Sequence, residues 1–99
     1  STGDGSYTDI AYRNLQRQVL EKALSALEDI PVELRDQSSM TMAIDTKLLP
    51  EAIQRITEFR RSLCDFLQSN TPNNDEVYHL SISIYPVTKV KEKGERNEN

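Results

Sequence analysis

Apolar side chains recur at steps of three or four residues over the first third of the chain, which is the spacing of one face of a helix. The repeat is carried by Leu15, Val19, Ala23, Leu27 and Ile30. We expect Ser6 or Thr8 to cap this helix, and Pro31 to end it, because proline disfavours helical geometry in the residue before it. The positions between the apolar rows are mostly charged and predict a solvated outer side.

A second stretch with the same repeat begins at Leu49. Pro50 fits the opening turn of this helix, where its missing N–H costs little. Its apolar positions are Leu49, Ile53, Ile56, Phe59, Leu63, Phe66 and Leu67. We expect this second helix to run to about Ser69. The polar sequence SNTPNNDE that follows is typical of a loop.

Two shorter stretches, residues 38–45 and 77–87, alternate polar and apolar side chains, and a period of two predicts a strand. In the first stretch one face holds Met40, Met42 and Ile44, and the other holds Ser39, Thr41 and Ala43. In the second stretch one face holds Tyr78, Leu80, Ile82 and Ile84, and the other holds His79, Ser81, Ser83 and Tyr85.

The order of these elements predicts an α+β fold, a two-layer α-β-α-β unit in which two helices cover one face of a two-stranded sheet. The second helix is long enough to return the chain to the start of the first strand, so we expect parallel strands joined by a right-handed crossover. Such a sheet has open edges and an uncovered face, which dimerisation or a neighbouring domain would complete. The candidate interface or ligand face is Ser39, Thr41, His79, Ser81, Ser83 and Tyr85.

The chain has 99 residues, which is enough for a single hydrophobic core. We expect an N-terminal linker over residues 1–8 and one folded domain over residues 9–90. Residues 91–99, KEKGERNEN, have almost no apolar content and predict a disordered polar tail.

The formal net charge of −4 argues against unaided binding to nucleic acid, which needs a cationic surface. The single cysteine, Cys64, leaves no partner for an intrachain disulfide and fits a reducing compartment. No apolar run approaches the roughly 20 residues of a membrane span, and the first residues lack the pattern of a signal peptide. We therefore expect a cytoplasmic protein that does not bind membranes.

Few residues offer catalytic chemistry. The only histidine, His79, would need a hydroxyl within hydrogen-bond reach, and only Ser39 or Thr41 across the sheet could supply one, because Ser81 lies nearly 7 Å along the strand. Spread-out carboxylates and three glycines near the chain ends give neither a metal site nor a phosphate loop. We expect no enzymatic activity and no cofactor. Met40, Met42 and Tyr78 could instead form an apolar cavity for a small-molecule effector.

Three segments, TGDGSYTDIAYRNLQRQVLEKALSAL, RDQSSMTMAI and YHLSISIYPVTK, occur in an order and at a spacing that resemble a family of bacterial transcriptional regulators. The resemblance covers residues 2 to 89 and concerns the C-terminal domain of that family, which has no assigned function. It implies that an N-terminal helix-turn-helix or winged-helix region, which is not in this chain, makes the DNA contacts.

Three functions follow as hypotheses. The first is a homodimerisation or effector-sensing domain of a transcriptional regulator, which the uncovered sheet and the resemblance favour. The second is a small acidic protein-binding module of the antitoxin or immunity type. The third is an enzyme that uses His79 with a hydroxyl of the sheet, and it lacks any device to stabilise an oxyanion.

Overall fold

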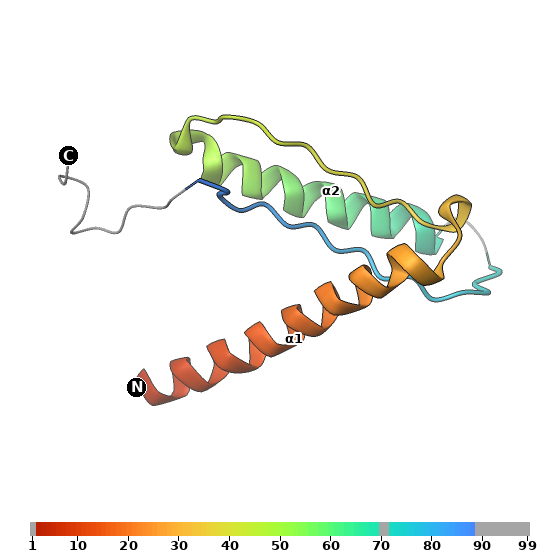
Figure 1. Ribbon diagram of the computed structural model, residues 1–99, viewed down its shortest axis with the longest axis horizontal. Helices are drawn as coiled ribbons and strands as arrows, with labels where there is room; N and C mark the ends of the chain where they lie inside the picture. Colours follow the sequence, from red (N-terminus) through yellow and green to blue (C-terminus); the bar gives the residue numbers. More distant parts are fainter. Residues whose placement is uncertain (1, 70–71, 89–99) are drawn as a thin grey trace. The chain divides into compact units, whose positions relative to one another are not determined.

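A computed structural model describes residues 2–69 and 72–88 of the chain. In order along the chain, the regular elements are the α-helix α1 (Thr2–Asp29), the 3-10 turn η1 (Val32–Leu34), the 3-10 turn η2 (Thr46–Leu48) and the α-helix α2 (Leu49–Ser69). They fall into two compact units, Ser1–Ile44 with α1 and η1, and Asp45–Asn99 with η2 and α2 (Figure 1).

The first helix is present, but it begins earlier than its sequence suggests. Because α1 starts at Thr2, both Ser6 and Thr8 lie inside the helix, and the expectation that one of them caps it is wrong. Its end at Asp29, two residues before Pro31, confirms the prediction. Residues 2–8 therefore continue α1, while the domain limits drawn at residues 9 and 90 stay predictions.

After α1 the chain turns at Pro31, whose carbonyl oxygen accepts a 2.9 Å hydrogen bond from the backbone N–H of Leu34. The segment beyond η1 returns to α1 through side chains. Gln37 Nε2 donates a 2.7 Å hydrogen bond to the carbonyl oxygen of Ala23 in the body of the helix. The RDQ tripeptide at residues 35–37 thus fastens the end of α1 instead of serving only as a polar link.

In the second unit, local hydrogen bonds build the turn η2, which leads directly into α2. Asp45 Oδ1 accepts a 3.0 Å hydrogen bond from the backbone N–H of Lys47, and the carbonyl oxygen of Asp45 accepts one of 2.9 Å from that of Leu48. Pro50 occupies the first turn of α2, and the helix ends at Ser69, so both predictions are confirmed.

The predicted α+β fold is wrong. The described residues contain two α-helices and no strand, so the fold is helical and the two-stranded sheet, with its crossover, does not form. Residues 35–45 and 72–88, where the strands were expected, are irregular. A helix satisfies its backbone through nearby residues, whereas two parallel strands depend on distant pairing and are weak as an isolated pair.

The polar tail expected over residues 91–99 lies outside the described residues. Among the side chains that are described, none is fully buried. Partial cover is found on α1 at Val19, Ala23 and Ala26, and on α2 at positions that include Ala52 and Ile56. Each unit therefore holds one long helix whose apolar side is covered only in part.

Candidate interaction surface

The six residues of the candidate face are all exposed, but they belong to separate units. Ser39 and Thr41 follow η1 in the first unit. The other four, which lie in the irregular segment of the second unit, are His79, Ser81, Ser83 and Tyr85. That all six share one face stays a prediction.

Within the second unit, apolar side chains at alternate positions are the less exposed ones. Leu80, Ile82 and Ile84 are 37%, 39% and 40% exposed, whereas Tyr85 is 70% exposed. The segment lacks strand hydrogen bonding. Tyr78, which the sequence places on the same face as these three residues, is 69% exposed, so the alternation separates only the three aliphatic side chains from Tyr85.

His79 and Cys64 carry the imidazole and the thiol considered from the sequence. His79 is exposed in the irregular segment, and Cys64 is a half-buried free thiol on α2. Over residues 2–69 and 72–88, no three His, Cys, Asp or Glu side chains come together in a way that could hold a metal ion. A metal-binding role therefore gains no support from the part of the chain that the structure describes.

The methionines considered for an effector cavity lie open to solvent. Met40 is 78% exposed and Met42 is 55% exposed, and Tyr78 in the other unit is 69% exposed. Side chains that lined an apolar cavity would be largely covered. The cavity expected around these residues is not supported.

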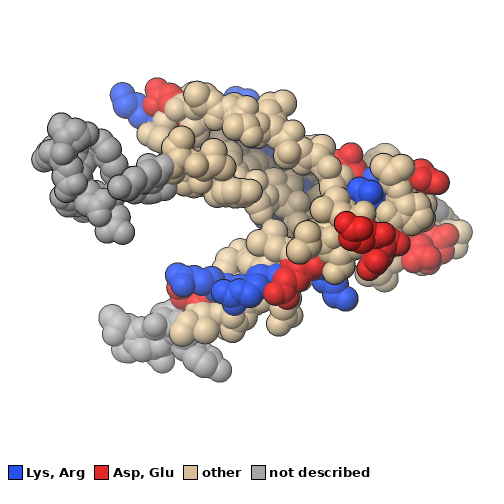
Figure 2. All heavy atoms as spheres, in the orientation of Figure 1, with Lys and Arg blue, Asp and Glu red and all other residues tan. Residues whose placement is uncertain are grey.

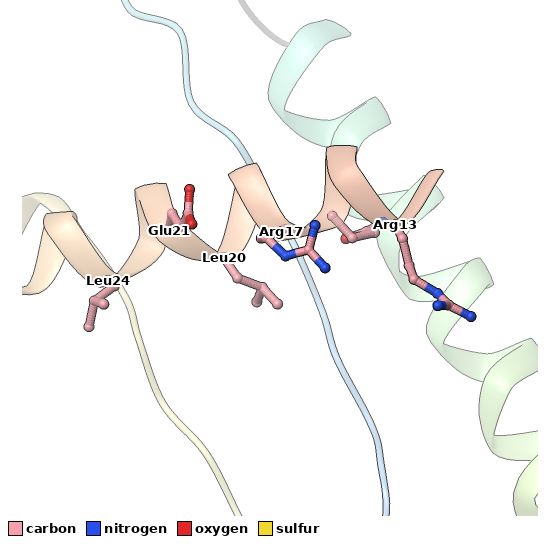
Figure 3. Close-up of a pocket in the computed structure, with 6 residues that line it drawn as sticks. Arg13, Arg17, Leu20, Glu21 and Leu24 are labelled. Carbon is pink, nitrogen blue, oxygen red and sulfur yellow. The ribbon is translucent and has the colours of Figure 1, made fainter. Parts of the chain in front are cut away.

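A surface that sequence periodicity missed lies on α1. An open groove runs along one side of this helix (Figure 3), and we call it the α1 groove. It is lined by Arg13, Gln16, Arg17, Leu20, Glu21 and Leu24. In Figure 3, Leu20 and Leu24 project from the same side of the helix. Both leucines sit in the sector that the sequence predicts to be a solvated outer side.

The exposure of these two leucines is high for residues in the middle of a long helix. Leu20 is 52% exposed and Leu24 is 66% exposed. The sequence contains this row, because Arg13, Arg17, Leu20 and Leu24 follow one another at steps of four, three and four residues, the spacing of one side of a helix. A longer apolar row on the same helix drew attention away from it.

Charged and polar groups occupy the N-terminal part of the α1 groove. Arg13 pairs with Asp9 at 3.1 Å, and both side chains are more than half exposed. Arg17 Nη1 donates a 2.8 Å hydrogen bond to Asn14 Oδ1. Figure 2 shows basic side chains along α1. The groove therefore combines a basic end with an apolar middle.

The second unit has an apolar stripe of its own along α2. Six of its positions recur at alternating steps of three and four, the spacing of a helix that packs against another helix: Leu49, Ala52, Ile56, Phe59, Leu63 and Phe66. Beside this stripe, Ile53 and Leu67 remain 48% and 56% exposed. As with α1, the stripe is only partly covered.

Neither helix, over the residues that the structure describes, is long and apolar enough to cross a membrane.

No curated protein and no solved structure matched the chain. One family model matches residues 4–87, from the first turn of α1 to nearly the end of the irregular segment of the second unit. That match includes both helices, the α1 groove and all six residues of the candidate face. It spans far more than half of the sequence, and on this basis the chain belongs to the family described as Domain of unknown function (DUF4423).

Proposed function

We propose that this chain is a dimerisation domain of a bacterial transcriptional regulator and that it acts in the cytoplasm without catalysis. Its activity would be to join two copies of the regulator, while a separate N-terminal region binds DNA. The regulator context rests on the resemblance of the three sequence segments quoted above. The dimerisation role rests on the surface of the domain itself.

The observation that carries this proposal is the partly covered apolar stripe on the one long helix of each unit. Burial of apolar surface is the main favourable term in folding, and one helix cannot bury its own apolar side. Each unit contains a single long helix with a half-covered stripe. Chains that leave such surfaces open are commonly stable only as oligomers.

An effector-sensing role has less support, because Met40 and Met42 are 78% and 55% exposed. The acidic module of the antitoxin or immunity type rests on the net charge of −4 alone, and no feature of the described surface favours it over dimerisation. DNA binding by this chain by itself is disfavoured by the same net charge.

Light scattering over a concentration series tests the proposal. We expect the mass to approach twice the 11.3 kDa of one chain as concentration rises. We also expect the midpoint of thermal unfolding to rise with concentration, because association stabilises the folded state by mass action. A mass of one chain at every concentration, with an unfolding midpoint that does not move, contradicts dimerisation.

A further inference from the structure

The apolar side chains of α1 form two adjoining rows, and the second row offers a surface for a further neighbour. Val19 and Ala23 lie on the partly covered face. Leu20 and Leu24 each come one residue later, so they lie about 100° further round the helix axis. Leu27 of the first row lies seven residues after Leu20 and about 20° from it round the axis, so the two rows adjoin. A neighbour centred on Val19 leaves Leu24 at its edge, where the α1 groove stays open to a second occupant.

The second face carries charges in a definite order. Five residues at steps of four, three, four and four share this side of the helix, and we call them the Leu20 face: Arg13, Arg17, Leu20, Leu24 and Glu28. From the N-terminus this side is basic at Arg13 and Arg17, apolar at Leu20 and Leu24 with Glu21 beside them, and acidic at Glu28. All five side chains are exposed.

This order is self-complementary when a second α1 runs in the opposite direction. The midpoint between Leu20 and Leu24 is position 22. At a rise of 1.5 Å per residue, Arg17 lies about 8 Å to one side of the midpoint and Glu28 about 9 Å to the other. A second copy turned by a twofold axis through the midpoint therefore brings Arg17 opposite Glu28 of the partner subunit, and does so twice.

A parallel arrangement gives the opposite electrostatic result. It would place Arg17 beside the partner's Arg17 and Glu28 beside the partner's Glu28, and like charges in contact oppose association. The charge order thus favours an antiparallel crossing, the isologous contact typical of twofold dimers.

We propose that the Leu20 face is the site at which two copies of this chain meet, with the two α1 helices antiparallel and crossing at Leu20 and Leu24. This interface deepens the proposed function and rests on it. The leucines form the apolar centre, and the paired charges at either side fix the direction of the helices.

Arg17 can serve this contact while keeping its present bond. Its Nη1 donates to Asn14 Oδ1 at 2.8 Å within the same helix. A guanidinium has five N–H donors, so others remain for a carboxylate of the partner subunit. Arg13, already paired with Asp9 at 3.1 Å, stands further from the crossing.

Charge reversal tests the interface through mixing. In Arg17→Glu, and separately in Glu28→Arg, each homodimer acquires two like-charge contacts, and we expect its dissociation constant to rise about tenfold or more. When the two variants are mixed, every contact is again between opposite charges. We therefore expect a heterodimer about as tight as the wild-type dimer, measured by light scattering or by native mass spectrometry.

Matched controls use the other side of the same helix. Lys22→Glu and Asp29→Arg change the charge by the same amounts but lie away from the Leu20 face, and we expect both to dimerise like the wild type. Circular dichroism shows whether each variant keeps its helices.

A wild-type chain that never dimerises overturns the proposed function and this interface with it.

Two outcomes overturn the interface alone. One is a wild-type dimer that tolerates both single reversals. The other is a mixture that stays as weak as its two components. Either result leaves dimerisation intact and moves it to another surface.

A disulfide trap gives the direction of the helices by an independent measurement. In a Cys64→Ser background, Leu20→Cys mixed with Leu24→Cys should form mainly the mixed disulfide, because the antiparallel crossing places position 20 opposite position 24. A parallel pair would instead give the two homodisulfides, and that result would contradict the proposed geometry.

Discussion

Arg35 Nε donates a 2.8 Å hydrogen bond to the carbonyl oxygen of Ile30, just past the end of α1. Arg35 Nη2 also donates to the carbonyl oxygen of Leu27 at 3.5 Å, and Nη1 donates to Gln37 Oε1 at 3.2 Å. The last carbonyl groups of a helix lack partners within it, and a cation there interacts favourably with the helix dipole. Arg35 therefore fastens the C-terminal end of α1.

The first prediction concerns this contact. We expect Arg35→Ala to lower the free energy of unfolding by about 1 kcal/mol, the typical net value of hydrogen bonds of this kind. Urea denaturation at one fixed protein concentration measures the change. Arg55→Ala is the matched control, because Arg55 pairs with Glu51 at 2.8 Å but both side chains are largely exposed.

Exposed ion pairs contribute roughly 0–1 kcal/mol, so the control should lose less stability than Arg35→Ala. Equal losses in the two variants would mean that Arg35 acts only as another surface charge.

The second prediction concerns η2, the turn that leads into α2. Asp45 accepts a hydrogen bond from the backbone N–H of Lys47, and Asp45→Ala removes that acceptor. We expect a loss of about 1 kcal/mol, as for other capping residues. Asp45→Asn keeps an acceptor oxygen and should restore most of this stability in thermal or urea unfolding. An alanine variant as stable as the asparagine variant would argue against a capping role.

The third prediction follows from the helical fold. With 28 residues in α1 and 21 in α2, about half of the chain is helical, and circular dichroism should report a helical protein. Hydrogen exchange should protect backbone amides in the interior of both helices and leave those at residues 39–44 and 80–84 unprotected. Strong protection at those two segments would contradict the absence of strands among the described residues.

Local patterns in the sequence were sufficient to locate both helices. Their apolar repeats depend on residues a few positions apart, and Pro31 and Pro50 act directly on their own neighbours. The strands failed for the converse reason. Alternation at Met40 and Ile82 is compatible with a strand, but pairing needs a distant segment that the pattern does not specify. Methionine and serine at residues 38–42 add little intrinsic preference for a sheet.

The α1 groove escaped detection for a different reason. One apolar row on a helix is read easily as its buried face, and that row contains Val19 and Ala23. Leu20 and Leu24 form a second, shorter row, and charged neighbours make it resemble a solvated side. In the structure Val19 and Ala23 are partly covered while Leu20 and Leu24 are exposed, although Leu15 and Leu27 of the first row are also 56% and 47% exposed. The order of charges from Arg17 to Glu28 could have been found from the sequence alone.

The fourth prediction compares two neighbours in the segment of the second unit. Ile82 is 39% exposed and Ser83 is exposed. Ile82→Ala removes apolar contact and should destabilise the fold, whereas Ser83→Ala should change the free energy of unfolding by less than about 0.5 kcal/mol. Equal effects measured by urea denaturation would mean that the alternation no longer distinguishes two faces.

The fifth prediction separates the Leu20 face from the candidate face that includes Ser83. If two copies meet through α1, Ser83→Arg should leave the dissociation constant of the dimer unchanged, because a side chain outside the interface adds charge only to exposed surface. Leu24→Gln should weaken the dimer, since it removes an apolar contact at the crossing, and glutamine preserves the helix as well as leucine does to within a few tenths of a kcal/mol. Sedimentation equilibrium on the two variants measures both constants. A dimer split by Ser83→Arg and untouched by Leu24→Gln would place the contact on the candidate face instead of on α1.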